Sequence, residues 1–230
     1  MFFSLSTHNF LLKICSARLV SLRKARSKEF FNFFIIMNIQ KSYPYILIIG
    51  SVIGLLASFT LVLNTIELIK NPNTELPCNI NPLISCSSVA STWQNTVFGF
   101  PNSILGIIAF SMLLAIGIML YFSGYKPRKS FWLLVNLGTL AAMTFVIWFF
   151  YQSVYSIGSL CIYCMIVWAV TWPIFLYTTV WNIQEDHFNV EHRVLNILNF
   201  VSRHHIQILI TVYLTAIFLI LFQFRDFFFN

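Results

Sequence analysis

The chain has 230 residues, of which 58% are hydrophobic and only 9% are charged. An ordinary soluble domain carries about 25% charged residues, so the composition excludes that class and indicates a membrane protein. The formal net charge of +7 does not indicate nucleic-acid binding, because the basic residues follow a membrane-topology pattern.

Residues 1–40 form a basic, partly apolar N-terminal segment that includes Cys15. The segment lacks the order of a signal peptide, in which a charged stretch precedes an apolar stretch and a cleavage site. Two interpretations remain open: an amphipathic helix at the cytoplasmic membrane surface, or a chain whose translation begins at Met37. On the reducing side of the membrane, Cys15 is expected to be an ordinary thiol.

Five apolar stretches without any Asp, Glu, Lys or Arg approach or exceed the roughly 20 residues that span a bilayer. We predict that all five are transmembrane helices, because closed barrels, the other spanning solution, show short alternating segments that are not seen here. The predicted spans are Tyr45–Leu63, Ile104–Phe122, Phe131–Tyr151, Leu160–Val180 and Ile206–Phe224.

The basic residues predict the orientation of these spans. Twelve of the fourteen Lys and Arg residues lie before the first span, between spans two and three, or between spans four and five. These segments are therefore predicted to be cytoplasmic. The opposite side has only Lys70 and Arg225, so the link 64–102, the start of the fourth span and the C-terminal tail are predicted to lie outside.

The outer link 64–102 is long, and connections of such length usually serve a function. Its first half is interrupted by Pro72, Pro77 and Pro82. From Ser85 onward the sequence SCSSVASTWQNTVFG predicts a short amphipathic helix at the outer surface, with Ser85 as its N-cap. Gly99 and Pro101 are expected to end it before the second span.

Four of the five cysteines fall on the predicted outer side: Cys78 and Cys86 in the link, and Cys161 and Cys164 at the start of the fourth span. Disulfides persist on such an oxidising side. Residues i and i+3 of a helix have Cβ atoms about 5–6 Å apart, so Cys161 and Cys164 are expected to form a reversible disulfide. A helix N-terminus also favours a thiolate at Cys161, the attacking species in disulfide exchange.

Two cysteine pairs in series require a terminal electron acceptor. The chain contains no Rossmann glycine motif and no CxxCH haem-attachment motif, so a lipid-soluble quinone is the expected acceptor. The aromatic fraction of 17% provides side chains for a quinone pocket between helices. The flexible link pair would then carry electrons from a soluble partner to the pair at the fourth span.

The cysteines also allow other interpretations. Cys161 and Cys164 alone could be an incidental packing pair, and Cys78 and Cys86 alone could be a permanent disulfide that staples the loop. Four cysteines could also bind zinc. The separation of Cys78 and Cys86 by seven residues and the oxidising side argue against zinc, so no metal is expected.

The cysteine-bearing segments resemble a known family. PCNINPLISCSSVASTWQNTVFGFPNSILGI, followed by LCIYCMIVW, is similar to the vitamin K epoxide reductase family in its bacterial form, over roughly Tyr45 to Val180. The resemblance implies an all-α membrane protein: a four-helix transmembrane bundle around a quinone, a fifth transmembrane helix, and a short horizontal helix in the first outer loop. The expected division is 1–40, a catalytic bundle 41–182, a cytoplasmic linker 183–205, and the fifth helix with its tail, 206–230.

The resemblance also implies a role for each cysteine. Cys78 would exchange with the thiols of a thioredoxin-like partner, and Cys86 would pass the electrons to Cys161. Cys164 would lie nearest the quinone and reduce it. The chain would thus be a membrane thiol oxidase that generates disulfides with a quinone, menaquinone or ubiquinone, as acceptor.

Further residues match the family's quinone contacts. Asn102 matches an asparagine that hydrogen-bonds a quinone carbonyl, although it could instead cap the second span. Either Ser91 or Thr92 matches a hydroxyl residue after the loop pair. Trp168, one turn after Cys164, matches an aromatic quinone contact, although tryptophan is common in membrane helices.

Many bacterial relatives carry a fused thioredoxin-like domain after the fifth helix, whereas this chain stops at Asn230. We therefore expect a separate DsbA-like partner outside the bacterial inner membrane. Epoxide reduction with the same cysteines and a non-enzymatic membrane protein with a stapled outer loop remain alternatives. A DsbB-type oxidase is rejected, because it has its CxxC in the first outer loop and its spaced pair in the second.

Overall fold

The structure is a computed structural model that describes residues 41–225 except residues 73, 75, 82, 124–126 and 186–199. The predictions for residues 1–40, including a start at Met37, for most of the linker 183–205 and for residues 226–230 lie outside the described residues. The chain divides into the units Met1–Lys41 and Ser42–Asn230, and almost all of the described residues belong to the second unit.

The described residues are almost entirely helical, and five helices are long and apolar enough to cross a membrane. The predicted number of spans is confirmed. The five are the first helix, Lys41–Lys70, then α3 (Asn102–Ser123), α4 (Lys129–Tyr151), α5 (Ile162–Gln184) and α7 (His205–Gln223). The π-helical turn η2 (Gln152–Ile157) continues α4 without a break.

The first helix extends seven residues beyond its predicted end at Leu63. At about 1.5 Å per residue, its thirty residues span about 45 Å, well beyond the roughly 30 Å of a bilayer core. The predicted span ended at the first polar residues, Asn64 and Thr65, and the charged residues Glu67 and Lys70 follow them, although the helix continues through all four. Asn64 is therefore a helical residue rather than part of the loop.

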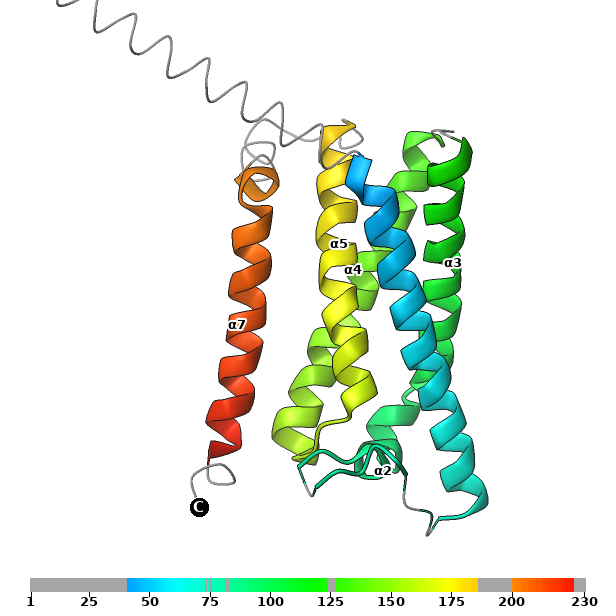
Figure 1. Ribbon diagram of the computed structural model, residues 1–230, viewed down its shortest axis with the longest axis vertical. Helices are drawn as coiled ribbons and strands as arrows, with labels where there is room; N and C mark the ends of the chain where they lie inside the picture. Colours follow the sequence, from blue (N-terminus) through cyan, green and yellow to red (C-terminus); the bar gives the residue numbers. More distant parts are fainter. Residues whose placement is uncertain are drawn as a thin grey trace, which may run out of the picture. The chain divides into compact units, whose positions relative to one another are not determined.

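The first helix, α3, α4 and α5 stand side by side, and α7 lies along α5 (Figure 1). A buried cluster joins the first four of these helices through side chains that include Tyr43, Phe110, Trp132 and Ile174. The first helix and α3 approach closely at Gly54, where an added Cβ would lie 2.5 Å from the ring of Phe110. Small residues at helix contacts allow such close packing in membranes.

A short helical segment lies across one end of the bundle, which we call the cysteine end (Figure 1). It consists of α2 (Cys86–Ala90) and the 3₁₀ turn η1 (Trp93–Thr96). The Ser85 side chain accepts a hydrogen bond from the N–H of Ser88, so the predicted N-cap is confirmed. Gly99 has a φ of +80°, a conformation that favours glycine, where the chain turns toward α3.

The fifth membrane helix is attached to α5 by a hydrogen bond at a proline. Pro173 lies inside α5 and has no N–H to donate to the carbonyl of Ala169, four residues earlier. The hydroxyl of Tyr213 in α7 donates to that carbonyl at 2.5 Å. A neighbouring helix therefore satisfies the acceptor that the proline leaves free.

We predict that Tyr213→Phe lowers the free energy of unfolding by about 1 kcal/mol, because the Ala169 carbonyl loses its donor. In a Pro173→Ala background the new N–H at position 173 supplies a donor within α5, so the same change should cost less. Thermal unfolding of the native chain, both single variants and the double variant in one detergent measures this coupling. An equal cost of Tyr213→Phe in both backgrounds would contradict the assignment.

Candidate functional site

Two backbone hydrogen bonds join the loop before α2 to the segment before α5. The N–H of Leu160 donates to the carbonyl of Leu83 at 2.8 Å, and the N–H of Ser85 donates to the carbonyl of Leu160 at 3.0 Å. They form a parallel bridge between Ile84 and Leu160. Because Cys86 and Cys161 immediately follow the bonded residues, the bridge brings these two cysteines together.

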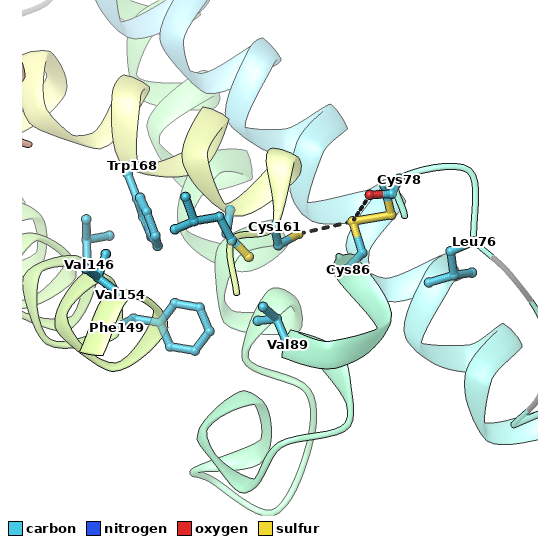
Figure 2. Packing of buried hydrophobic residues seen from close by; sticks show 11 residues of the cluster. Leu76, Cys78, Cys86, Val89, Val146, Phe149, Val154, Cys161 and Trp168 are labelled. Carbon is cyan, nitrogen blue, oxygen red and sulfur yellow. Dashed lines mark hydrogen bonds between the residues drawn. A yellow bond between two sulfur atoms is a disulfide. The ribbon is translucent and has the colours of Figure 1, made fainter. Parts of the chain in front are cut away.

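The Sγ atoms of Cys86 and Cys161 lie 3.4 Å apart, although the two residues are separated by 75 positions in the sequence. Cys86 is also joined to Cys78 in a disulfide, with a Cα–Cα distance of 5.7 Å. Figure 2 shows Cys161 facing this disulfide. The structure therefore places a free thiol against one sulfur of a disulfide, the arrangement that thiol–disulfide exchange requires.

The loop disulfide is fixed to α2 by Asn79. The side-chain oxygen of Asn79 accepts from the N–H of Ser87 at 3.2 Å and from the hydroxyl of Ser85 at 3.3 Å, while its nitrogen donates to the hydroxyl of Ser87 at 2.5 Å. Cys78 and Cys86 are both buried. We did not predict Asn79 from the sequence, although its place directly after Cys78 in a turn-rich loop is typical of such side-chain contacts.

Cys161 is the N-cap residue of α5, with extended backbone, and its carbonyl accepts the first helical hydrogen bond from Met165. The predicted position at a helix N-terminus is thus confirmed. The Cys164 side chain lowers the pKa of the Cys161 thiol below its ordinary value, and the nearby N–H groups of Cys164 and Tyr163 lower it further, against an opposing effect of burial. The site therefore favours a thiolate at Cys161.

Cys161 and Cys164 are both free and buried. The structure thus holds an oxidised loop pair beside a reduced CxxC pair. Cys164 lies in an apolar cluster with Val154, Phe149 and Trp168, which Figure 2 shows around the site. The ring of Trp168 lies 5.1 Å from that of Phe150 and 6.5 Å from that of Phe149, both edge-on.

Asn102 begins α3 and is buried. Its side-chain nitrogen donates to the carbonyl of Gln94 in η1 at 2.6 Å, so the side chain ties η1 to α3. The Gln94 side chain is buried as well, and its nitrogen donates to Gln152 of η2 at 3.5 Å. Asn102 is thus part of a polar contact between three elements at the cysteine end.

Several buried oxygens near this contact have no hydrogen-bond partner among the described residues. They are Oδ1 of Asn102, Oε1 of Gln94, and the hydroxyls of Ser103 and Ser153. A buried polar group without a partner costs about 1–3 kcal/mol. These atoms are therefore suited to a polar ligand that supplies hydrogen-bonding groups at this end of the bundle.

The two hydroxyl candidates lie at the end of α2. The hydroxyl of Ser91 donates to the carbonyl of Ser88 at 3.1 Å, and that of Thr92 donates to the carbonyl of Val89 at 2.8 Å. Both hydroxyls thus bond to backbone carbonyls of α2. The structure does not bring either hydroxyl into a hydrogen bond with a cysteine of the described chain.

Two surface hollows flank the bundle. One, of about 400 Å³, lies between Thr65 and Leu68 of the first helix on one side and, on the other, Ser87 of α2 and its C-cap residue Ser91. The other, of about 510 Å³, lies between the first helix and α5 near Pro173. Within the described part of the chain, no group of three or more His, Cys, Asp or Glu residues could hold a metal ion.

Comparison with known proteins bears on this site. The sequence model of the vitamin K epoxide reductase family matches residues 45–179. The match spans both cysteine pairs, Asn102 and Trp168. No curated protein matches the chain.

We predict that a Cys78→Ala/Cys164→Ala variant forms a disulfide between Cys86 and Cys161 on mild oxidation, because their sulfurs are already in contact. The matched control is Cys86→Ala/Cys161→Ala, which retains the two outlying cysteines and should form far less disulfide. Mass spectrometry of the digested proteins measures both yields. Similar yields in the two variants would contradict the observed pairing.

Proposed function

The chain belongs to the vitamin K epoxide reductase family, and on that premise we propose that it is a membrane thiol oxidase that generates disulfides. Members of the family are oxidoreductases that use quinones, and five helices suited to a membrane make this an integral membrane protein. The proposed electron path runs from a thioredoxin-like partner through Cys78 and Cys86 to Cys161 and Cys164, and on to a quinone. The observation that supports this path best is the 3.4 Å contact between Cys86 and Cys161.

The first step oxidises the partner. A partner thiolate attacks Cys78, the Cys78–Cys86 bond breaks, and Cys86 leaves as a thiolate. The second partner thiolate then attacks the partner's sulfur in this mixed disulfide, and Cys78 leaves as a thiolate. The partner gains a disulfide while the loop pair gains two electrons, so no other oxidant is needed.

The second step moves the electrons within the chain. When Cys161 and Cys164 form a disulfide, the Cys86 thiolate attacks Cys161 and Cys164 leaves. The Cys78 thiolate next attacks Cys86 and Cys161 leaves, which restores the loop disulfide and produces the reduced CxxC pair. The N–H groups of Tyr163 and Cys164 at the start of α5 lower the pKa of the Cys161 thiol, which favours its departure as a thiolate. The state after this step matches the oxidised loop pair and free CxxC thiols of the structure.

The last step returns Cys161 and Cys164 to a disulfide, with loss of two electrons and two protons. A bound quinone supplies the acceptor for them. The buried aromatic side chains beside Cys164 provide an apolar, water-poor environment for this chemistry. The unpartnered oxygens of Asn102 and Gln94 could accept from the hydroxyls of a reduced quinone, and the second N–H of Asn102 could donate to a quinone carbonyl.

A permanently stapled loop would not require a thiol in contact with its disulfide, so the Cys86–Cys161 contact favours exchange over stapling. The excess of basic residues in the predicted cytoplasmic links supports an orientation with the cysteine end outside. We therefore propose that the chain serves a DsbA-like partner outside the bacterial inner membrane, with menaquinone or ubiquinone as acceptor.

The order of the two pairs predicts how single substitutions act. Cys164→Ser should abolish quinone reduction with every reductant, because the pair nearest the acceptor can no longer form a disulfide. Cys78→Ser should retain quinone reduction driven by a small dithiol that reaches Cys161, but lose turnover with a thioredoxin-like protein. Quinone loss monitored by absorbance, with the purified chain in detergent, measures both.

The matched control is Cys15→Ser, which removes the cysteine outside the two pairs and should leave turnover unchanged. Quinone reduction that survives Cys164→Ser would exclude the proposed path. Equal loss with both reductants in Cys78→Ser would show that Cys78 does not receive the partner's electrons.

A further inference from the structure

A side chain from the first helix contacts the loop disulfide. The amide nitrogen of Asn64 donates a hydrogen bond to Sγ of Cys78 at 3.6 Å. Asn64 lies six residues before the end of the helix, and Cys78 is fourteen positions further along the chain. Asn64 therefore touches a sulfur whose bonds break and form in the proposed reaction.

The surroundings of Asn64 are apolar. Leu61 and Leu68, three positions before and four positions after it, both pack against the buried cluster that contains the cysteines. Residues at these spacings share one face of a helix, so Asn64 is an amide within an apolar face. A leucine at position 64 would fill the same apolar face. Asparagine differs in that its amide donates a hydrogen bond to the Cys78 sulfur.

We propose that Asn64 stabilises the thiolate of Cys78 by donating its N–H to the sulfur. The inference rests on the proposed function, in which Cys78 becomes a thiolate when the oxidised partner leaves and then attacks Cys86. A neutral amide keeps its proton throughout, so the contact changes no electron or proton count. A hydrogen bond to a charged sulfur is stronger than one to a neutral disulfide, so the contact favours the reduced loop pair.

Asn64 is uncharged, and two charged residues follow it before the helix ends. Glu67 and Lys70 are both exposed, and Glu67 accepts a hydrogen bond from Asn71 at 3.3 Å. On the other side of the loop, Cys86 and Cys161 face each other. Among the described residues, the Asn64 side chain is thus the hydrogen-bond donor to the Cys78 sulfur.

The test uses the full-length chain with Cys86→Ala, so that Cys78 is a free thiol. The alkylation rate of Cys78 by iodoacetamide is followed by mass spectrometry from neutral to strongly alkaline pH, with Asn64 and with Asn64→Leu or Asn64→Asp. Leucine preserves the apolar face, and aspartate preserves the shape of the side chain without its donor. The matched control is Asn71→Ala, which removes an amide near the same helix end.

At neutral pH both Asn64 variants should slow alkylation by about tenfold, because a smaller fraction of the Cys78 thiol is ionised once its sulfur loses the hydrogen-bond donor. At strongly alkaline pH, where every thiol is ionised, the rates should converge. The Asn71→Ala control should match the parent at every pH. Equal neutral-pH rates with and without Asn64, or a slower rate that persists at alkaline pH, would overturn the inference.

A second measurement separates this inference from the proposed function. In the otherwise native chain, Asn64→Leu should slow partner-driven turnover but leave unchanged the rate at which a reduced Cys161–Cys164 pair reduces quinone. A native chain that fails to reduce quinone would refute the proposed function, while the alkylation profile would still decide the role of Asn64.

Discussion

The site depends on one short stretch of backbone pairing. The hydrogen bonds between Leu160 and its two partners, Leu83 and Ser85, tie a loop between the first two membrane helices to the start of α5. Without this bridge, Cys86 would be attached only to its own loop. With it, Cys86 and Cys161 meet with their sulfurs 3.4 Å apart, and the Ser85 cap sets where α2 begins.

Side chains around the bridge give the sulfurs different environments. The Cys161 thiol lies at a helix N-terminus that favours a thiolate, whereas Cys164 lies one turn into α5, in the apolar cluster that includes Phe149 and Trp168. On the loop side, Asn79 holds α2 and Asn64 reaches Cys78. All four sulfurs lie in one buried apolar cluster at one end of the helical bundle, where a free thiol contacts a disulfide.

The sequence predicted what depends on local patterns. Five apolar runs predicted five long helices, and the cap residue Ser85 and the position of Cys161 followed from helix-end chemistry. The bridge at Leu160 was not predictable, because backbone pairing between residues 75 or more positions apart leaves no local pattern. The hydrogen bond from the Tyr213 hydroxyl to the Ala169 carbonyl joins residues 44 positions apart and likewise leaves no local pattern. Asn64 was assigned to the loop because polar residues ended the predicted span, although the helix continues beyond them.

The central claim is that the two cysteine pairs act in series on one acceptor. It is tested most directly by fully reducing the chain, removing the reductant, and counting the quinone molecules that each chain then reduces. Two dithiol pairs of two electrons each predict two quinones per chain, and one quinone for a Cys78→Ser/Cys86→Ser variant. A native chain that reduces one quinone, as the variant does, would show that the loop pair does not deliver electrons to Cys161 and Cys164.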